Sequence, residues 1–223
     1  MERKLPDIFL ELADIFDRHG FHLYMIGGTS RDFLLGRECE DYDFCSDALV
    51  EEMMTFLPDL KAPYAHLGSA YLRYHGVRVD ITTLRVEDDY IDHRHPDKIM
   101  FTRSIEDDYK RRDFTINAIY IDKDGRIFDF VDGLKDLHFC LIRMIGNPYI
   151  RIVEDPLRIL RALRFKLLLN FDLENHLAKV IQENSFLLKE LTPEKVNREI
   201  DKMRIIDENY AVFLKKFNIL LEY

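Results

Sequence analysis

Apolar positions in the first half of the chain follow short periodic patterns that glycine and proline interrupt. Between Leu5 and Arg18 the apolar residues recur at helical spacing, and this predicts a helix that ends before Gly20. A second helix is expected over residues 49–57, because Pro58 follows it. Short alternating segments predict strands at 22–26, 41–45, 64–67, 70–74, 77–84, 116–122 and 126–130.

Two further segments of this half are expected to lie outside regular structure. Lys123-Asp124-Gly125 separates two of the predicted strands and indicates a β-hairpin turn. Glu87–Pro96 is mostly polar and predicts a mobile loop. The longer segment Arg85–Pro96 is too polar for a core, which favours a hinged lid.

After Pro148 the pattern becomes helical. Helices are expected over 154–170, 176–191, 193–206 and 210–217, and Thr192-Pro193 has the residue types of a helix start. The predicted fold class is therefore α+β. We expect a mixed α/β domain over 1–150 and an all-helical domain over 151–223.

Composition narrows the class of protein. With 47% hydrophobic and 33% charged residues in 223, the chain can bury a core, which excludes wholesale disorder. No apolar run approaches the roughly 18 residues of a membrane span, and Met1–Asp7 lacks the apolar stretch of a signal peptide. Cys39, Cys45 and Cys140 form no C-x-x-C pair, which is typical of a reducing compartment. We expect a cytoplasmic protein without a membrane partner.

The net charge of −9 argues against a protein that coats polyanions unspecifically. It leaves room for an enzyme with a local basic groove. Composition alone therefore does not separate a nucleic-acid enzyme from other classes of enzyme.

The first chemical pattern is a glycine pair followed by two carboxylates. Asp41 and Asp43 alternate on a predicted strand, so they point to one side about 6.6 Å apart along it. Two such carboxylates suit divalent metal ions, and Mg²⁺ prefers carboxylate oxygens. The turn at Gly27-Gly28 lets backbone N–H groups approach a triphosphate, and Arg31 adds positive charge.

Each part of this pattern also has an ordinary structural interpretation. A lone D-x-D is commonly an exposed strand face, and a lone glycine pair is commonly a turn; their combination favours a site. The chain contains neither G-x-x-x-x-G-K-[ST] nor G-x-G-x-x-G, so neither a P-loop nor a dinucleotide fold explains the glycines. Asp80 is a candidate third carboxylate, and a solvent-facing strand residue is the equal alternative.

A second pattern places Lys110, Arg111 and Arg112 between Asp108 and Asp113. The three basic side chains are candidates for binding phosphates or ribose. Alternatively, one arginine forms an internal ion pair with one of the two acids. We expect both interpretations to hold for different arginines.

A third pattern places Arg158, Arg161 and Arg164 near one helical face. The positions four residues on are not acidic, and only Arg158 has an acid four residues back, Glu154. Such a stripe favours a polyanionic ligand over an ordinary solvated face. Asp155 either caps this helix or, with Arg158, reads a nucleotide base through its hydrogen-bonding edge.

His93 and His95 lie within the polar segment 85–96. They are weak candidates for metal ligands, because the sequence offers no further ligands at a diagnostic spacing.

These patterns, in this order, resemble the class II tRNA nucleotidyltransferase (CCA-adding enzyme) and bacterial poly(A) polymerase family of the DNA polymerase β superfamily. The resemblance covers roughly residues 20–170. Ser30 stands where the family usually has valine. The matching motifs are Gly27–Gly36 with Asp41-x-Asp43, Arg85–Pro96, Arg111–Ala118, and Glu154–Arg158 with Arg161 and Arg164.

The resemblance implies a nucleotidyltransferase (polymerase β-like) head with a mixed sheet, followed by a helical neck, without the family's body and tail regions. It implies untemplated nucleotidyl transfer by a two-metal mechanism, with Mg²⁺ as cofactor. The implied metal ligands are Asp41 and Asp43, with Asp80 as a candidate. The implied nucleotide-binding residues are Gly28, Arg31, Arg112, Asp155, Arg158, Arg161 and Arg164.

The expected activity is addition of C and A to the tRNA 3′ end from CTP and ATP. A poly(A) polymerase or an A-only enzyme is the alternative, and Ile142–Pro148 somewhat resembles the poly(A) branch. The sequence is also compatible with a head that needs a partner to bind RNA, with an inactive RNA-binding module, and with a nucleotidyltransferase for small molecules or proteins. It leaves the oligomeric state open.

Overall fold

The computed structural model describes residues 4–39, 41–90 and 96–219. Its contacts divide the chain into two compact units, each described separately below. The first unit comprises Met1–Asp88, Lys98–Arg112 and Ile116–Leu134, and the second comprises Asp89–Asp97, Asp113–Thr115 and Lys135–Tyr223. These units differ from the predicted head and neck, whose division at residue 150 stays a prediction.

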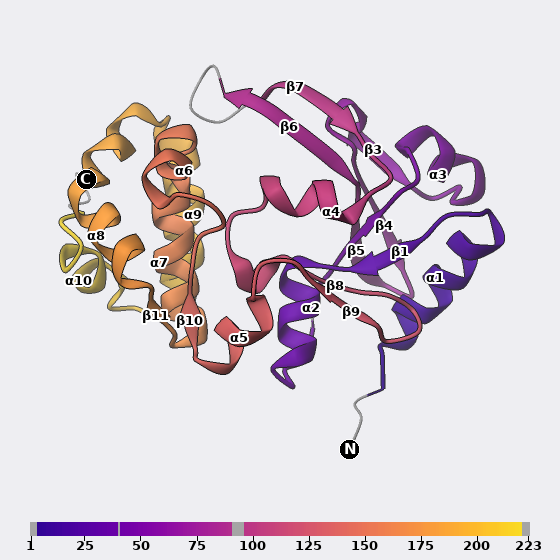
Figure 1. Ribbon diagram of the computed structural model, residues 1–223, viewed down its shortest axis with the longest axis horizontal. Helices are drawn as coiled ribbons and strands as arrows, with labels where there is room; N and C mark the ends of the chain where they lie inside the picture. Colours follow the sequence, from indigo (N-terminus) through magenta and orange to yellow (C-terminus); the bar gives the residue numbers. More distant parts are fainter. Residues whose placement is uncertain (1–3, 40, 91–95, 220–223) are drawn as a thin grey trace. The chain divides into compact units, whose positions relative to one another are not determined.

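The first unit is built around a seven-stranded mixed sheet, and this confirms the predicted α+β class (Figure 1). β2 and β5 run parallel, whereas the other five neighbouring pairs are antiparallel. The strands, in order across the sheet, are β3 (Lys61–Tyr64), β4 (Ser69–Tyr74), β5 (Val77–Thr83), β2 (Tyr42–Ser46), β1 (Leu23–Met25), β8 (Ile119–Ile121) and β9 (Ile127–Asp129).

One face of the sheet carries the main core. Phe44 of β2 packs there against Phe9 of α1 (Asp7–Arg18), with ring centroids 5.2 Å apart. The apolar residues of α1 recur at helical spacing, so one side of the helix covers this face. α3 (Val50–Phe56) contributes Val50 and Met53 to the same core.

The other face of the sheet carries a smaller core. Successive strand residues point to opposite faces, so Cys45 and Tyr120 lie on the side away from Phe44. The helix α4 (Ile105–Asp108) and the 3₁₀ turn η2 (Tyr109–Arg111) add Ile105 and Tyr109 to this face.

One strand prediction and one loop prediction need correction. Residues 64–67 are not a strand, because β3 ends at Tyr64 and a 3₁₀ turn, η1 (Ala65–Leu67), follows it. The predicted loop at 87–96 is partly regular, since β6 (Arg85–Tyr90) and β7 (Pro96–Phe101) form a two-stranded sheet. Backbone pairing needs no apolar side chains, so polarity did not exclude a strand there. His93 and His95 lie outside the described residues.

The predicted hairpin is confirmed. β8 and β9 pair antiparallel, and the N–H of Asp122 donates to the carbonyl of Arg126 at 3.1 Å. Gly125 adopts φ +78°, which the turn requires and which glycine tolerates.

The second unit is largely helical. Its strands β10 (Leu141–Ile142) and β11 (Asp172–Leu173) pair parallel, and η4 (Ser185–Glu190) completes the segment predicted as helix 176–191. α9 begins at Pro193 as predicted. The helices are α5 (Gly133–His138), which begins in the first unit, α6 (Pro148–Glu154), α7 (Leu157–Leu169), α8 (Asn175–Asn184), α9 (Pro193–Ile206) and α10 (Tyr210–Lys215).

Within residues 4–39, 41–90 and 96–219, every helix is too short or too polar to cross a lipid bilayer.

Candidate functional site

Strand pairing brings Asp43 and Asp80 side by side. Asp43 on β2 is the register partner of Asp80 on the parallel strand β5. Neighbouring strands lie about 4.8 Å apart, so the two side chains share one face at close range. Arg78 holds both oxygens of Asp80, through Nε at 2.8 Å and a terminal nitrogen at 2.7 Å.

Asp41 lies one residue before β2 and is exposed. Arg78 has a raised pKa, mainly through its hydrogen bonds and ion pair with Asp80, and the charge of Asp41 adds to this shift. Asp41 therefore lies in the electrostatic neighbourhood of the other two carboxylates.

The glycine pair lies directly against Asp43. Gly27 begins α2 (Gly27–Leu34) with φ +64°, a conformation that favours glycine. The N–H of Gly28 donates to Asp43 Oδ2 at 3.3 Å, and a Cβ added to Gly28 would lie 3.3 Å from the same oxygen. The N–H of Asp43 donates to the hydroxyl of Thr29 at 2.6 Å. The absence of side chains on the pair thus leaves room for this close approach.

The environment of Asp43 favours a bound cation. Asp43 is exposed, yet the surrounding protein removes part of the water from its carboxylate. This desolvation and the charge of Asp80 raise the pKa of Asp43, while the Gly28 hydrogen bond and the charges of Arg112 and Arg31 oppose the shift. A cation between the carboxylates would relieve the repulsion.

The carboxylates present could hold a divalent metal ion only together with further ligands. Among the described residues, no three His, Cys, Asp or Glu side chains form a ready metal cluster. Mg²⁺ is usually bound by one or two carboxylates, with water and substrate phosphates completing its octahedron. Asp41 and Asp43 match such a site, whereas Asp80 is already engaged by Arg78.

Arg31 lies on α2 but is buried. Its guanidinium donates to both oxygens of Asp32, at 3.0 and 2.8 Å, and to Asn117 Oδ1 at 2.8 Å. These contacts join α2 to η3 (Thr115–Asn117).

Arg111 and Arg112 both form ion pairs with Asp108, at 2.8 and 2.7 Å. Burial alone would raise the pKa of Asp108, but the charges of Arg112 and Arg111 lower it well below its usual range. Lys110 differs, since it is exposed and pairs with the half-buried Asp107. Thus the predicted internal pairing involves two arginines and one acid.

In the second unit, Asp155 lies at the start of α7. Its Oδ1 accepts the N–H of Leu157 at 3.1 Å, which is the predicted capping contact. Arg158 is 5% exposed and donates to Glu154 Oε2 at 3.0 Å and to the carbonyl of Arg151 at 2.6 Å. Asp155 therefore lies two residues before α7, and Arg158 lies in the first turn of that helix.

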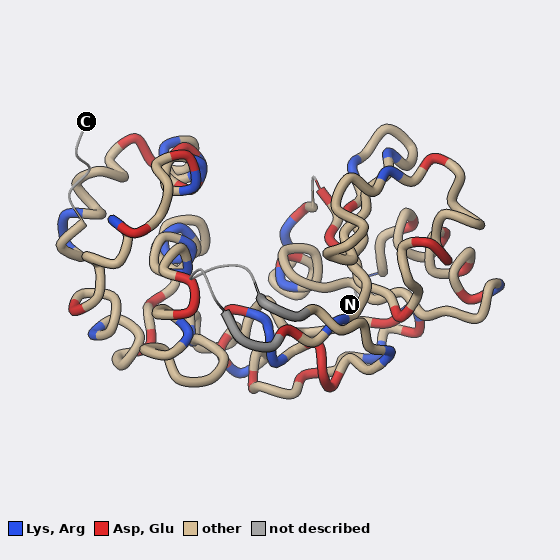
Figure 2. Tube along the Cα trace, turned by 90° about the horizontal axis from the view of Figure 1, so that it is seen from above, with Lys and Arg blue, Asp and Glu red and all other residues tan. Residues whose placement is uncertain are grey.

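Arg161 and Arg164 have acidic partners that local spacing did not reveal. Arg161 Nε donates to Asp113 at 2.7 Å, across 48 residues of sequence. Arg164 Nε donates to Glu199 of α9 at 2.7 Å, across 35 residues. Figure 2 shows basic and acidic residues interspersed in both units. Counting acids four residues away thus misses pairs that form in the fold.

Glu199 should make stability depend on pH. Its burial would raise the pKa, but Arg164 and Lys202 lower it below 4.5. Because the pKa of Glu199 is lower in the folded chain than in the unfolded chain, the ionised side chain stabilises the fold above pH 4.5. This contribution disappears as the pH falls through the pKa of the folded state. We expect Glu199→Gln to lower the free energy of unfolding by about 1.5–3 kcal/mol at pH 7. In urea unfolding, this free energy should then fall less steeply as the pH is lowered.

The matched control is Glu194→Gln, which lies on the same helix and pairs with Arg198 in solvent. It should change stability by less than about 0.5 kcal/mol. Identical pH profiles for Glu199→Gln and the unmodified chain would contradict the prediction.

Local sequence patterns do not single out Tyr120, Arg78 or Glu199. Tyr120 has the pattern of an ordinary strand aromatic, and Arg78 that of an exposed strand residue. Side chains alternate along a strand, so the sequence does predict that Arg78 and Asp80 lie on the same face. No local signal connects Glu199 to Arg164.

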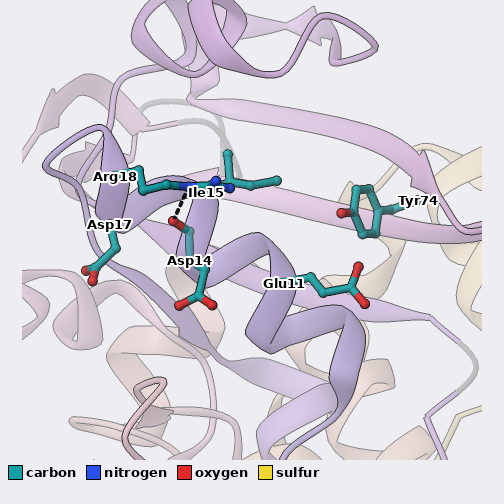
Figure 3. A pocket seen from close by; sticks show the side chains of 6 residues that line it. All are labelled: Glu11, Asp14, Ile15, Asp17, Arg18 and Tyr74. Atoms are coloured by element: carbon teal, nitrogen blue, oxygen red, sulfur yellow. Dashed lines mark hydrogen bonds between the residues drawn. The ribbon is translucent and has the colours of Figure 1, made fainter.

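A surface hollow of about 520 Å³ lies along α1, and no predicted site residue lines it. Figure 3 shows Glu11 of α1 pointing toward Tyr74 of β4, with Asp14 and Asp17 projecting from the same helix. Arg18 Nε donates to the carbonyl of Asp14 at 3.2 Å. The lining residues are Glu11, Asp14, Ile15, Asp17, Arg18 and Tyr74.

Comparison with known proteins finds relatives over nearly the whole chain. It is 39% identical over 216 residues to the CCA-adding enzyme of Ligilactobacillus salivarius (strain UCC118), covering 96% of this chain and 53% of that protein. It is also 39% identical over 206 residues to the CCA-adding enzyme of Lactobacillus helveticus (strain DPC 4571), covering 91% and 51%. The chain therefore spans about half the length of these relatives.

Solved structures give the same result. The Bacillus stearothermophilus CCA-adding enzyme in complex with CTP matches with a TM-score of 0.81 and 32% identity, over 89% of this chain and 49% of that one. The Thermotoga maritima CCA-adding enzyme complexed with tRNA_CCA matches with a TM-score of 0.71 and 30% identity, over 91% and 48%. The α+β architecture is thus shared with these enzymes.

Residues 23–143 match the family described as the poly A polymerase head domain. This segment is more than half of the 223 residues and contains β2, β5 and the glycine pair. The chain therefore belongs to the poly A polymerase head domain family.

Proposed function

We propose that this chain is the nucleotidyl-transfer part of a CCA-adding enzyme, which adds C and A to the 3′ end of tRNA from CTP and ATP. The observation that carries the proposal is the Asp41-x-Asp43 pair beside the glycine turn that begins α2. The relatives named as CCA-adding enzymes support it, as do solved relatives with CTP and with tRNA_CCA.

Nucleotidyltransferases of this family generally use a divalent metal, and we propose Mg²⁺. Asp41 and Asp43 would hold it, and Asp80 is the candidate third carboxylate. When bound, the metal would supply charge stabilisation for the attacking hydroxyl and the departing pyrophosphate. Asp43 would contribute a carboxylate oriented by the hydrogen bond from the Gly28 N–H, on a backbone that the Asp43 N–H fixes to the Thr29 hydroxyl.

The nucleotide would be held by backbone and arginine groups of the first unit. Gly28 offers its backbone without a side chain in the way. Arg112 would contact the ribose or the phosphates. Arg31 is engaged with Asp32 and Asn117, so its role in nucleotide binding would be to keep α2 in place and add positive charge.

We propose that Asp155 and Arg158 recognise the base. A carboxylate accepts from an exocyclic amino group, and a guanidinium donates to a ring nitrogen or carbonyl. Arg161 and Arg164 would add positive charge for the nucleotide. In this proposal residues 1–150 form the nucleotidyltransferase head and residues 151–223 the helical neck.

Label transfer tests the function. The protein is incubated with Mg²⁺ and labelled CTP or ATP, and with three RNAs. The RNAs are a tRNA lacking CCA, a tRNA ending in CC, and an unrelated RNA. Asp41→Ala is the control for transfer at the proposed site.

Sequential addition of C and then A on tRNA alone would support the proposal. Long A tails on any RNA would replace it with a poly(A) polymerase, and A without C would indicate an A-only enzyme. Metal-dependent nucleotide binding without transfer would indicate a head that needs a partner to bind RNA. Nucleotide binding that survives both metal removal and Asp41→Ala would contradict an enzymatic site here.

A further inference from the structure

Asp108 is fully buried and collects hydrogen bonds from four residues. Its Oδ1 accepts from the backbone N–H of Arg85 at 3.1 Å and from Arg111 Nε at 2.8 Å. Its Oδ2 pairs with Arg112 at 2.7 Å and accepts from the Tyr120 hydroxyl at 2.7 Å. One carboxylate therefore joins β6, η2 and β8.

Arg112 contacts both Asp108 and Tyr120. Its Nε donates to Asp108 Oδ2 at 3.0 Å and to the Tyr120 hydroxyl at 2.9 Å. Its guanidinium also lies over the Tyr120 ring, 5.2 Å from the centroid. Because the guanidinium is planar with donors in a fixed fork, holding one edge fixes the orientation of the whole group.

This arrangement lies on the sheet face that carries Asp43. Tyr120 packs with Cys45 in the smaller core. Asp43 is two residues before Cys45 on β2, so both point to the same side. In agreement, the charge of Arg112 is among the groups that lower the pKa of Asp43.

The ion pairs of this group extend to Arg85 and Glu87. Arg85, Arg111 and Arg112 contribute three positive charges against those of Asp108 and Glu87, which pairs with Arg85 at 2.5 Å. The three arginines and two acids are thus joined in one ion-pair network around Asp108.

We propose that Asp108, together with Tyr120, is a positioning residue that holds Arg112 in the orientation in which it contacts the nucleotide. This inference rests on the proposed function, since it assumes that the ligand is a nucleoside triphosphate. Neither side chain needs to touch the nucleotide itself.

A double-mutant cycle tests it on the full chain. Asp108→Asn, Tyr120→Phe and Arg112→Ala are made singly, and the first two are also combined with Arg112→Ala. The dissociation constants of CTP and ATP are measured by equilibrium binding in Mg²⁺, alongside KM and kcat in label transfer. Asp107→Asn is the matched control, because Asp107 is the preceding acid and pairs only at the surface with Lys110 among the contacts described.

We expect Asp108→Asn to weaken nucleotide binding by about tenfold or more, and Tyr120→Phe by about threefold to tenfold. When Arg112→Ala is already present, neither change should weaken nucleotide binding much further, because the residue through which they act is gone. Asp107→Asn should bind as the unmodified chain does. Tyr120→Phe keeps the aromatic ring, so it carries the test if Asp108→Asn fails to fold.

Unchanged dissociation constants in a folded Tyr120→Phe would overturn the inference. Losses that persist in full without Arg112 would also overturn it, because the residues would then act independently of that arginine. Failure of the proposed function gives a different result: the unmodified chain would bind nucleotide without transferring it, while the binding cycle still decides the role of Asp108. An unmodified chain that binds no nucleotide would overturn the positioning role.

Discussion

Asp43→Asn is expected to lower the rate of nucleotidyl transfer on the order of 10³-fold or more, because it removes half of the proposed metal-binding carboxylate pair. The protein should stay folded. Desolvation and the nearby Asp80 raise the pKa of Asp43, so its ionised form is disfavoured in the folded state. Asparagine removes that charge and keeps an oxygen that can accept the Gly28 N–H.

The measurement is label transfer together with thermal unfolding of the same preparations. Asp59→Asn, an exposed acid of the same unit, should leave both unchanged. More than a tenth of the original rate in Asp43→Asn would show that Asp43 is not a metal ligand for this reaction.

The largest loss of stability is expected from Phe44→Ala. Phe44 is 1% exposed, and its ring packs against Phe9 at 5.2 Å and Tyr42 at 5.7 Å. Removing a buried aromatic side chain costs about 3–5 kcal/mol, since the cavity does not close completely. Because Phe44 directly follows Asp43 on β2, transfer should be lost in parallel with folding.

Urea unfolding of the full chain, followed by far-ultraviolet circular dichroism, measures this effect. Phe44→Leu keeps most of the apolar volume and should cost less than half as much. Tyr64→Ala, at an exposed aromatic of β3, should stay within about 0.5 kcal/mol of the unmodified chain. A loss below about 1 kcal/mol for Phe44→Ala would mean that the core re-packs around the site.

The strongly periodic elements could be predicted from the sequence. The helix at 5–18 and the β8–β9 hairpin are examples, because each shows its pattern within a short window. The strand prediction at 64–67 is wrong, because a single 3₁₀ turn has no strong sequence pattern of its own. The polarity of the segment 87–96 predicts a loop, but β6 extends through Tyr90 because strand pairing depends on the backbone and not on apolar side chains.

The neighbourhood of the acidic pair was only partly predictable. Short-range patterns in the sequence predict two of its features, namely the alternation of Asp41 and Asp43 and the nearby glycine pair. They do not predict the pairing of Asp43 with Asp80, since it depends on which strands become neighbours. The same limit applies to Arg161 with Asp113 and to Arg164, whose acidic partners are distant in sequence.

The parallel pairing of β2 with β5 also has a consequence for the order of folding. Between them the chain must form α3, β3 and β4, so Asp43 gains Asp80 as its neighbour only after a long loop has closed. Local elements such as α1 can form earlier, because their contacts span few residues. During synthesis on the ribosome, the acidic centre would therefore assemble only once β5 has emerged, and cation binding would report that late step.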